Sequence, residues 1–458
     1  MTTFFIDNHG CAKNQTDGEL ICGFLEQAGF TLSDSPDTSD FIIINSCGFI
    51  EAAKKESIEA VYSVKANYPE AKIILAGCLA QRYAQELNAS MPELDGIFGN
   101  GDLSKIAEYM NKIKTAIETG SKEKPAPALY PQVGICEGNR PHLFNFKGSA
   151  YVKITEGCSN NCSFCAIPLI RGPVRSRPAK NIVQEIKALV ASGVYEINLI
   201  GQDLAAFREG DKGLAYLLKQ ISQLQGNFIV RTLYIHPDHF NTDILSVYKE
   251  DNRFVPYFDI PFQSGDDEII RAMNRVGPAG RYVELVNKIR SELPSAVLRT
   301  TFLTGFPGET EKAAENTKQF LKAINPNWSG CFAYSREEDT PAYSFKGRIP
   351  ARTAQKRAAA LEEIQSELTA AHNQKFVGQE LDVLVEEIIA AATDSAAVEA
   401  EGLAIGRAWF QAPEVDGSVV IRYDADDKNQ CRVIAPGKVV KVKVLASTGI
   451  DLDGRLIV

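Results

Sequence analysis

The stretch EGCSNNCSFC, residues 156–165, decides the prediction of the fold. Its three thiols belong to Cys158, Cys162 and Cys165. They directly follow a strand-like apolar run, residues 151–154, and the glycine and asparagines among them predict a loop rather than a helix. Three thiolates in one loop can hold a 4Fe-4S cluster and leave one iron open, whereas zinc normally takes four ligands and no fourth Cys or His lies nearby. A structural zinc site and chance clustering of core cysteines are the alternatives.

Downstream of this loop, apolar runs alternate with helical patterns. The strand-like runs are residues 151–154, 197–200, 229–235, 257–260, 297–303 and 331–334. Amphipathic stretches such as 181–191 and 213–224 separate them, which is typical of βα units around a parallel sheet. Six such units are fewer than the eight that close a TIM barrel. We therefore expect an open six-strand (βα) TIM-like barrel.

Upstream of the loop, the same alternation predicts a small N-terminal α/β domain with a parallel sheet. Residues 3–6, 41–44 and 72–75 are apolar enough for buried strands. Residues 17–28 and 51–67 carry apolar side chains at helical spacing. The fold class is therefore α/β.

The tail is expected to form a separate unit. A helical segment, residues 352–375, leads to β-rich runs at 380–385, 419–423 and 438–444 that Gly and Pro punctuate. These runs predict a small OB-like all-β barrel. The expected divisions are residues 1–110 for the first domain, 111–146 for a linker rich in proline and charge, 147–375 for the open barrel and 376–447 for the all-β barrel.

Cys11, Cys47 and Cys78 form a second informative set, although they lie far apart in the sequence. Each follows the carboxyl end of one of the three expected strands of the first domain. Ligands of an open parallel sheet collect along that edge, so the three thiols can converge there. Each is also next to a glycine, which permits close backbone approach to a bulky group. We predict a second three-cysteine iron–sulfur site, with packing in the core as the alternative. The other cysteines, Cys22, Cys136, Cys331 and Cys431, fit neither set.

Composition excludes several classes of protein. The 458 residues carry 49 Lys and Arg against 58 Asp and Glu, a net charge of -9, which argues against a protein that works mainly by binding phosphates over a basic surface. With 45% hydrophobic residues, disorder is excluded as the main state. No apolar run approaches the ~18 residues of a membrane span. Ten cysteines without a basic, apolar leader indicate a cytoplasmic protein with reduced thiols.

The residues around the cysteine loop carry a resemblance to a known family. The loop is followed by Ile167-Pro168, Arg171-Gly172 and Ser176-Arg177-Pro178. This pattern resembles the radical S-adenosylmethionine (SAM) enzymes, and specifically their methylthiotransferase family, whose three parts are a methylthiotransferase domain, a radical SAM core and a TRAM domain. Residues 45–57, Gly406-Arg407 and residues 412–417 resemble the branch that acts on an aspartate of small-subunit ribosomal protein twelve.

The resemblance implies cofactors, chemistry and partners. It implies two 4Fe-4S clusters, one on each cysteine set, and two molecules of SAM, one as radical source and one as methyl donor. Sulfur delivered at the second cluster would reach the β-carbon of the aspartate. The implied partners are the ribosomal protein, an electron donor and a sulfur source, without a membrane. No catalytic residue beyond the cluster ligands is implied.

Further residues near the loop are candidates for binding. By resemblance, Phe164, Gly201, Gln202 and Asp203 contact SAM, although ordinary packing explains Phe164 equally well. A basic group also follows the loop, and it consists of Arg171, Arg175 and Arg177. These arginines could bind the carboxylate of SAM or of the substrate, and solvation at the start of a helix is an equal alternative.

The charge of the tail bears on the substrate. Residues 375–458 contain nine Lys or Arg and fourteen Asp or Glu, a net charge of -5. A barrel that serves tRNA should be basic, because phosphate contacts dominate nucleic-acid affinity. An acidic barrel suits a basic ribosomal protein, while acids that merely keep the surface soluble are the alternative. We therefore expect the ribosomal protein rather than the tRNA adenosine near the anticodon that related enzymes modify.

Overall fold

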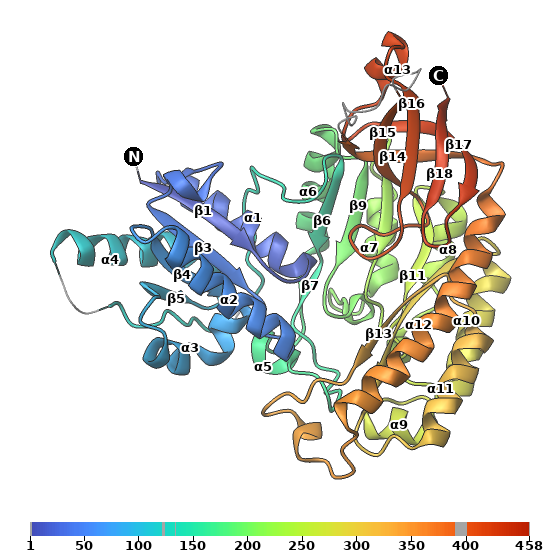
Figure 1. Ribbon diagram of the computed structural model, residues 1–458, viewed down its shortest axis with the longest axis horizontal. Helices are drawn as coiled ribbons and strands as arrows, with labels where there is room; N and C mark the ends of the chain where they lie inside the picture. The colour runs from blue at the N-terminus through green and yellow to red at the C-terminus, as the bar shows by residue number, and fades with distance from the viewer. Residues whose placement is uncertain (1, 121–123, 133, 390–400, 458) are drawn as a thin grey trace.

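The chain folds into three units, seen in the computed structural model (Figure 1). The structure describes residues 2–120, 124–132, 134–389 and 401–457. A parallel N-terminal sheet lies beside an open six-stranded sheet, and a closed five-stranded barrel lies at one end of the latter. Among the described helices, none is long and apolar enough to cross a membrane.

The N-terminal unit is a parallel sheet with strand order β2-β1-β3-β4-β5. Its strands are β1 (Thr3–Asn8), β2 (Thr31–Leu32), β3 (Phe41–Ser46), β4 (Lys72–Gly77) and β5 (Gly96–Phe98). Its helices are α1 (Ala12–Gln27), α2 (Glu51–Asn67), α3 (Cys78–Ser90) and α4 (Ile106–Glu118). β3 is buried along its whole length because helices cover both faces of the sheet, as the two apolar clusters on either side of it show.

The central unit is a six-stranded parallel sheet with strand order β13-β12-β11-β10-β9-β6, which confirms the expected open barrel. Its strands are β6 (Ser149–Lys153), β9 (Glu196–Ile200), β10 (Ile229–Thr232), β11 (Phe254–Asp259), β12 (Val297–Thr304) and β13 (Trp328–Ala333). The larger helices are α6 (Ala179–Ala191), α7 (Leu214–Ile221), α8 (Ile244–Glu250), α10 (Ala279–Glu292), α11 (Glu311–Ile324) and α12 (Ala351–Asn373). The shorter elements are β7 (Thr155–Glu156), α5 (Ile167–Arg171), β8 (Arg175–Ser176) and α9 (Asp267–Ala272).

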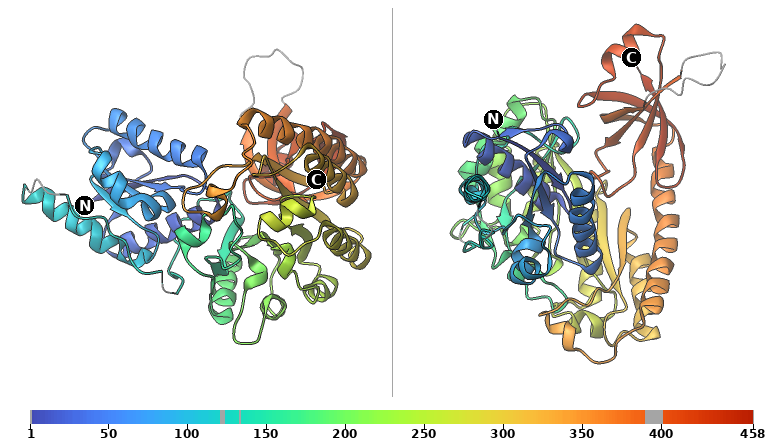
Figure 2. Two further views of the ribbon diagram at one scale, coloured as in Figure 1. Left: turned by 90° about the horizontal axis from the view of Figure 1, so that it is seen from below. Right: turned by 60° about the vertical axis from the view of Figure 1, so that its left-hand side comes forward.

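The C-terminal unit is a closed barrel with strand order β14-β15-β16-β18-β17, which confirms the expected all-β tail. Its elements are β14 (Glu380–Ile389), β15 (Glu401–Ala408), β16 (Val419–Asp424), α13 (Lys428–Val433), β17 (Val439–Ser447) and β18 (Leu452–Ile457). Helix α12 runs along the open barrel, and the chain then continues into the closed C-terminal barrel (Figure 2).

Buried polar contacts dock the C-terminal barrel onto the central sheet. Glu196 in β9 accepts hydrogen bonds from Arg407 at 2.7 Å and from Arg231 at 2.9 Å, and all three side chains are buried. Asp416, in the segment after β15, accepts a hydrogen bond from Tyr257 at 2.6 Å. Two of the segments that carry the family resemblance, Gly406-Arg407 and residues 412–417, thus lie where the C-terminal barrel meets the central sheet.

The structure differs from the sequence predictions at the weakest strands and at element ends. β2 and β5 in the first sheet, and β15 and β18 in the tail, were not predicted, because they are very short or are interrupted by Gly, Asp and Arg. The predicted boundary at residue 110 falls inside α4, and the predicted end at 447 precedes β18. Helix α1 begins at Ala12 rather than at residue 17, because its polar first turn is buried and its apolar periodicity is lost there. Residues 121–123 and 133 of the expected linker lie outside the described residues.

Candidate functional site

The first cysteine set lies in the loop that follows β7, at the carboxyl end of the open barrel. Cys158 donates its N–H to the carbonyl of Gly172 at 3.0 Å, and Ser163 donates its N–H to Met273 at 3.1 Å, so the loop is tied on both sides. Gly157 has a φ of +76°, and a Cβ there would lie 2.2 Å from the carbonyl oxygen of Pro173. Only glycine can therefore hold the start of this loop.

Two histidines and an aspartate support this loop from the segments that follow β9 and β10. The Nε2 atom of His236 lies 3.8 Å from the Sγ atom of Cys162. Asp203, which is 1% exposed, accepts a hydrogen bond from Asn160 in the loop at 3.0 Å and pairs with His239 at 3.0 Å. Both oxygens of Asp203 are occupied, because the other accepts the backbone N–H groups of Ala205 and His236. Asp203 therefore anchors the cysteine loop.

The thiols of the loop repel one another as thiolates. Burial, and secondarily the charge of Cys162, raises the pKa of Cys165 to about 12. Burial raises the pKa of Cys158 to about 11. A bound cationic centre would displace these protons, because only the thiolate binds metal.

The second cysteine set gathers at the carboxyl edge of the N-terminal sheet, as the sequence predicts. Cys11 precedes α1, Cys47 follows β3, and Cys78 is the first residue of α3. The Oδ1 atom of Asn14 lies 3.8 Å from the sulfur of Cys11 and 3.5 Å from that of Cys78. A Cβ at Gly10 would lie 2.9 Å from the Cβ of Cys47. The fold thus brings three strand ends to one place.

The residues around this second set fit a bulky sulfur-ligated group. Gly10 and Gly77 have φ values of +96° and +92°, and a Cβ at Gly48 would lie 2.8 Å from the backbone of Cys78 and Leu79, so side chains are excluded around the thiols. Burial, followed by the charge of Cys78, raises the pKa of Cys47 to about 12. Within the described ranges, no three His, Cys, Asp or Glu side chains are close enough to hold one metal ion. A four-iron cluster is larger than one ion and spaces its thiolates more widely.

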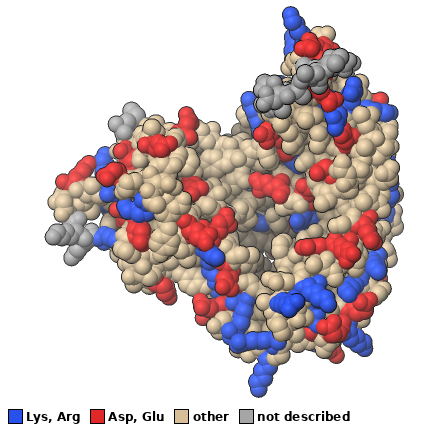
Figure 3. All heavy atoms as spheres, viewed as in Figure 1, with Lys and Arg blue, Asp and Glu red and all other residues tan. Residues whose placement is uncertain are grey.

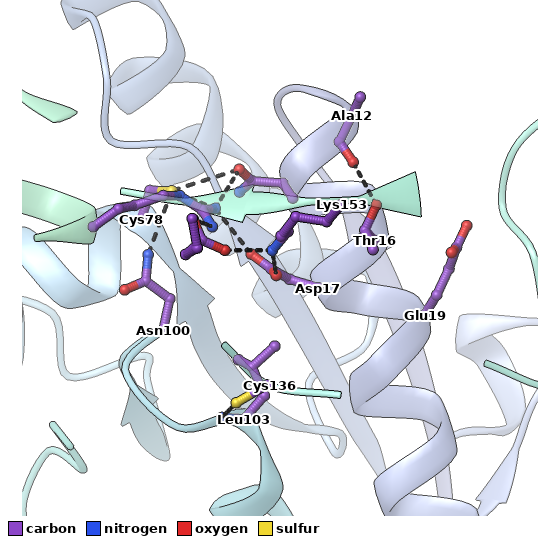
Figure 4. A network of polar contacts seen from close by, with 12 residues as sticks. Ala12, Thr16, Asp17, Glu19, Cys78, Asn100, Leu103, Cys136 and Lys153 are labelled. Carbon is purple, nitrogen blue, oxygen red and sulfur yellow. Dashed lines mark hydrogen bonds and ion pairs between the residues drawn. The ribbon is translucent and has the colours of Figure 1, made fainter. Parts of the chain in front are cut away.

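A buried network of ion pairs links residues that flank the first cysteine set to Cys78 of the second set (Figure 4). Lys153 of β6 contacts Asp17 of α1 at 2.5 Å and Glu156 at 2.6 Å. Arg171 of α5 contacts Asp17 and Glu156, both at 2.9 Å, and its Nη2 lies 3.1 Å from the sulfur of Cys78. Two cations thus face two carboxylates, which compensates the cost of burying charge.

The network fixes the charge states of its members. Burial opposes ionisation of Glu156, but Arg171 and Lys153 outweigh it and hold the pKa of Glu156 far below its usual value. Burial also opposes the charge of Lys153, and Asp17 and Glu156 outweigh it and raise the pKa of Lys153. The interface between the first and central units therefore contains buried ion pairs. Arg171, at the end of the helix that follows the first cysteine set, contacts the thiol of Cys78 in the second set.

The residues expected to contact SAM surround the loop in different ways. Phe164 is half-buried and packs beside Met273 and Phe306. A Cβ at Gly201 would lie 2.0 Å from the Oγ1 of Thr155, so Gly201 allows close packing of β9 on the loop's strand. Gln202 donates a hydrogen bond to Glu156 at 3.0 Å, and its Oε1 has no partner among the described residues.

The three arginines after the loop are not solvated helix-start residues. Arg171 is 3% exposed and Arg177 is 8% exposed, and both pair with carboxylates. Arg175 donates to three backbone carbonyls. Asp17, Lys153 and Glu156 were not predicted, because a charged residue in a helix or strand gives no signal of burial by itself.

The remaining cysteines are outside both sites. Cys22 and Cys331 are buried in apolar clusters, and Cys431 is exposed. The sulfur of Cys136 accepts the N–H of Leu103 at 3.1 Å.

Comparisons with known proteins agree with this architecture. The family described as "Uncharacterized protein family UPF0004" matches residues 3–99, the "Radical SAM superfamily" matches residues 152–321, and the "TRAM domain" matches residues 377–457. The chain is 51% identical to the ribosomal protein uS12 methylthiotransferase RimO of Treponema denticola, over 98% of this chain and 99% of that protein. The chain belongs to the RimO family. Another RimO, from Thermosipho africanus, is 37% identical over 99% of both chains.

Solved structures give the fold of the RimO family member independently. The radical SAM methyltransferase TsrM from Kitasatospora setae, with cobalamin and a [4Fe-4S] cluster bound, superposes with a TM-score of 0.54. The superposition covers 75% of this chain and 74% of TsrM at 13% sequence identity, so it shows a similar fold and nothing more. As a RimO family member, the chain is a radical SAM methylthiotransferase that uses two 4Fe-4S clusters and SAM.

Proposed function

We propose that this chain methylthiolates the β-carbon of an aspartate in the small-subunit ribosomal protein uS12. The similarity to RimO proteins covers all three units, and RimO proteins are named for uS12. One observation carries the proposal: the two cysteine sets lie on units that pack against each other, where Cys78 of the second set packs against Ala166, the residue after Cys165, and lies 3.1 Å from the Nη2 atom of Arg171. Two sites on one interface can generate a radical and deliver sulfur to the same carbon.

The proposed ligands are the six cysteines of the two sets. Cys158, Cys162 and Cys165 would hold the SAM-binding cluster, and Cys11, Cys47 and Cys78 would hold the sulfur-delivering one. When bound, these groups supply the deoxyadenosyl radical from SAM and the sulfur to be transferred. The protein's own backbone lets the second cysteine set come close together: a Cβ at Gly10, Gly48 or Gly77 would lie 2.9, 2.8 or 2.7 Å from neighbouring atoms.

We propose that three residues in and around the cysteine loop contact SAM. Phe164, Gly201 and Gln202 surround the cysteine loop, and the unpartnered Oε1 of Gln202 can accept a hydrogen bond from a ligand. We assign Asp203 to holding the loop through Asn160 rather than to direct SAM contact, since its oxygens are already used. An electron donor and a sulfur source complete the proposed reaction. Ten cysteines, six of them proposed as cluster ligands, suit the reducing conditions of the cytoplasm.

The charge of the C-terminal barrel supports a protein substrate. Arg407 is buried against Glu196, and Arg422 pairs with Glu401 at 2.8 Å and with Asp453 at 2.8 Å, so two of the few cations are neutralised. The remaining surface suits a basic ribosomal protein better than phosphate. Two acids of the tail, Asp394 and Glu399, lie outside the described residues.

Mass analysis of a deletion strain tests the proposal. We expect uS12 peptides to lose the methylthio group in the deletion strain and to regain it on expression of the chain. The Cys158→Ala variant, expressed at the same level, is the matched control and should restore nothing. Loss of methylthio groups from tRNA, with uS12 unchanged, would contradict the proposal.

A further inference from the structure

Helix α1 carries an unusual number of buried charges at the interface between the first and central units. Lys13, Asp17 and Glu19 are all at least nine-tenths buried. Asp17 pairs with Lys153 and Arg171, and Glu19 pairs with Arg140 at 2.5 Å. Lys13 differs from both: among the described residues, no ion pair or hydrogen bond reaches its Nζ atom. Its ammonium group faces the ring of Tyr234, and its N–H donors are left to bind an anion, because a largely buried cation is stabilised by a charged partner.

The carboxylates that act on Lys13, those of Asp259 and Glu156, do not supply that anion. Asp259, at the carboxyl end of β11, pairs with Arg299 at 3.5 Å and accepts the N–H of Tyr234 at 3.2 Å. Glu156 is held by Lys153 and Arg171. Both carboxylates are therefore engaged by other cations, and Lys13 is left with unused donors.

Lys13 lies between the two cysteine sets. It is two residues from Cys11, and its Nζ lies 2.9 Å from the ring centroid of Tyr234. Tyr234 is in turn two residues before His236, whose ring lies 3.8 Å from the sulfur of Cys162. An anion on Lys13 would thus lie between the place where sulfur is delivered and the place where SAM binds.

The backbone at this point is also strained. Tyr234 has a φ of +66°, a left-handed conformation that a bulky side chain rarely adopts. Such strain persists where the surrounding structure requires it, and it gathers at ligand sites. A hollow also separates the N-terminal unit from the other two units on the face seen in Figure 3, with basic side chains at its floor and acidic ones on its rim.

We propose that Lys13 binds the carboxylate of the substrate aspartate. This inference rests on the proposed function and names how its substrate is recognised. An ammonium group on the carboxylate fixes the aspartate side chain at its end, and the adjacent β-carbon is then directed between the two cysteine sets. The charge also selects aspartate over asparagine, which has nearly the same shape but no charge.

Peptide binding to the full-length enzyme with both clusters reconstituted tests this assignment. The probes are a uS12 peptide that carries the modified aspartate and the same peptide with asparagine. We expect the wild type to bind the aspartate peptide roughly tenfold or more tightly, because a charge-assisted hydrogen bond in a desolvated site is strong. Lys13→Gln should reduce this ratio to about one, and Lys13→Arg should retain most of it, since it keeps the charge.

Controls separate recognition from folding. Lys55→Gln removes the same charge from an exposed position of the N-terminal unit and should leave the ratio unchanged. Iron content and the dissociation constant for SAM should also stay at wild-type values in Lys13→Gln. If Lys13→Gln keeps the wild-type preference for aspartate, or weakens SAM binding instead, the assignment is wrong. Equal loss of iron in Lys13→Gln and Lys13→Arg would show that Lys13 only supports the Cys11 site, and this result also overturns it.

The wild type alone separates this inference from the proposed function. Equal binding of both peptides by an enzyme that methylthiolates uS12 would overturn the role of Lys13 and leave the function intact. Absence of any uS12 modification by the cluster-loaded wild type would overturn the proposed function itself.

Discussion

The two cysteine sites differ in how far apart their cysteines lie in the sequence. Cys158, Cys162 and Cys165 come from one loop of eight residues, whereas Cys11, Cys47 and Cys78 come from three strand ends that are 36 and 31 residues apart. The spacing of the thiols in the loop site is set locally, by Gly157 and by the hydrogen bond to Gly172, while Met273 and Asp203 tie the loop to the barrel. The dispersed site exists only when the first sheet has formed in its native strand order.

This difference teaches what each site depends on. The thiols of the local site are already neighbours in the sequence, while those of the dispersed site come together only if the sheet and the interface around them are intact. Arg171 makes the second site depend on the central unit as well, because it contacts Cys78 from α5. Changes in the sheet or in the interface should therefore harm the dispersed site first.

Removing each set of thiols should have the largest effect. The triple variant Cys158→Ala, Cys162→Ala and Cys165→Ala should retain about four of about eight irons and form no 5'-deoxyadenosine from SAM. The triple alanine variant of Cys11, Cys47 and Cys78 should also retain about four irons, yet still cleave SAM and transfer no sulfur. Iron and sulfide analysis with product chromatography measures both. SAM cleavage by the first variant would refute the division of roles.

Breaking the interface should have the next largest effect. Arg171→Met leaves the carboxylates of Asp17 and Glu156 with only Lys153, and removal of one partner from a buried ionic network costs about 3–5 kcal/mol. Denaturant titration of the apo protein should show this loss in the free energy of unfolding. Lys180→Met, which removes an exposed charge a few residues downstream, should cost less than about 0.5 kcal/mol. Equal effects of the two variants would remove Arg171 from the interface.

A methyl group at Gly10 should harm the dispersed site more narrowly. Gly10→Ala places Ala at a φ of +96°, which costs about 1–2 kcal/mol, and brings its Cβ to 2.9 Å from that of Cys47. We expect loss of iron at this site with normal SAM cleavage. Gly29→Ala has the same backbone strain at +87° but open space around its Cβ, so it should keep its iron. Normal iron loading in Gly10→Ala would show that this edge of the sheet is less constrained.

The smallest expected effect concerns the support of the loop site and depends on pH. The hydrogen bond to Asp203, opposed by burial, raises the pKa of His239 above 6.5. This pair therefore stabilises the fold fully below pH 6.5, and the stabilisation is lost as the pH rises through the raised pKa. Because His239 is 44% exposed, the change should be at most about 0.5 kcal/mol. Unfolding curves of the wild type and His239→Gln across this range measure it. A wild-type stability that rises with pH relative to His239→Gln would contradict the sign.

The sequence predicts the parts of the fold and site that local pattern controls. The six barrel strands and the cysteine loop follow from apolar runs and from spacing, and the second set follows from the rule that strand ends share an edge. The network of Asp17, Lys153, Glu156 and Arg171 could not be predicted, because its members lie in three separate segments and pair only after the units dock. The weak strands β15 and β18 were missed because barrel closure, rather than their own composition, makes them strands.

The contact between Arg171 and Cys78 bears on the order in which the enzyme takes up iron and docks its units. Cys78 is only 5% exposed once α5 lies against it. A cluster that arrives after the units have docked would have to break the ion pairs of Arg171 to reach this thiol. Loading the first domain before docking avoids that cost, so we expect iron to reach the dispersed cysteines before the interface closes over Cys78.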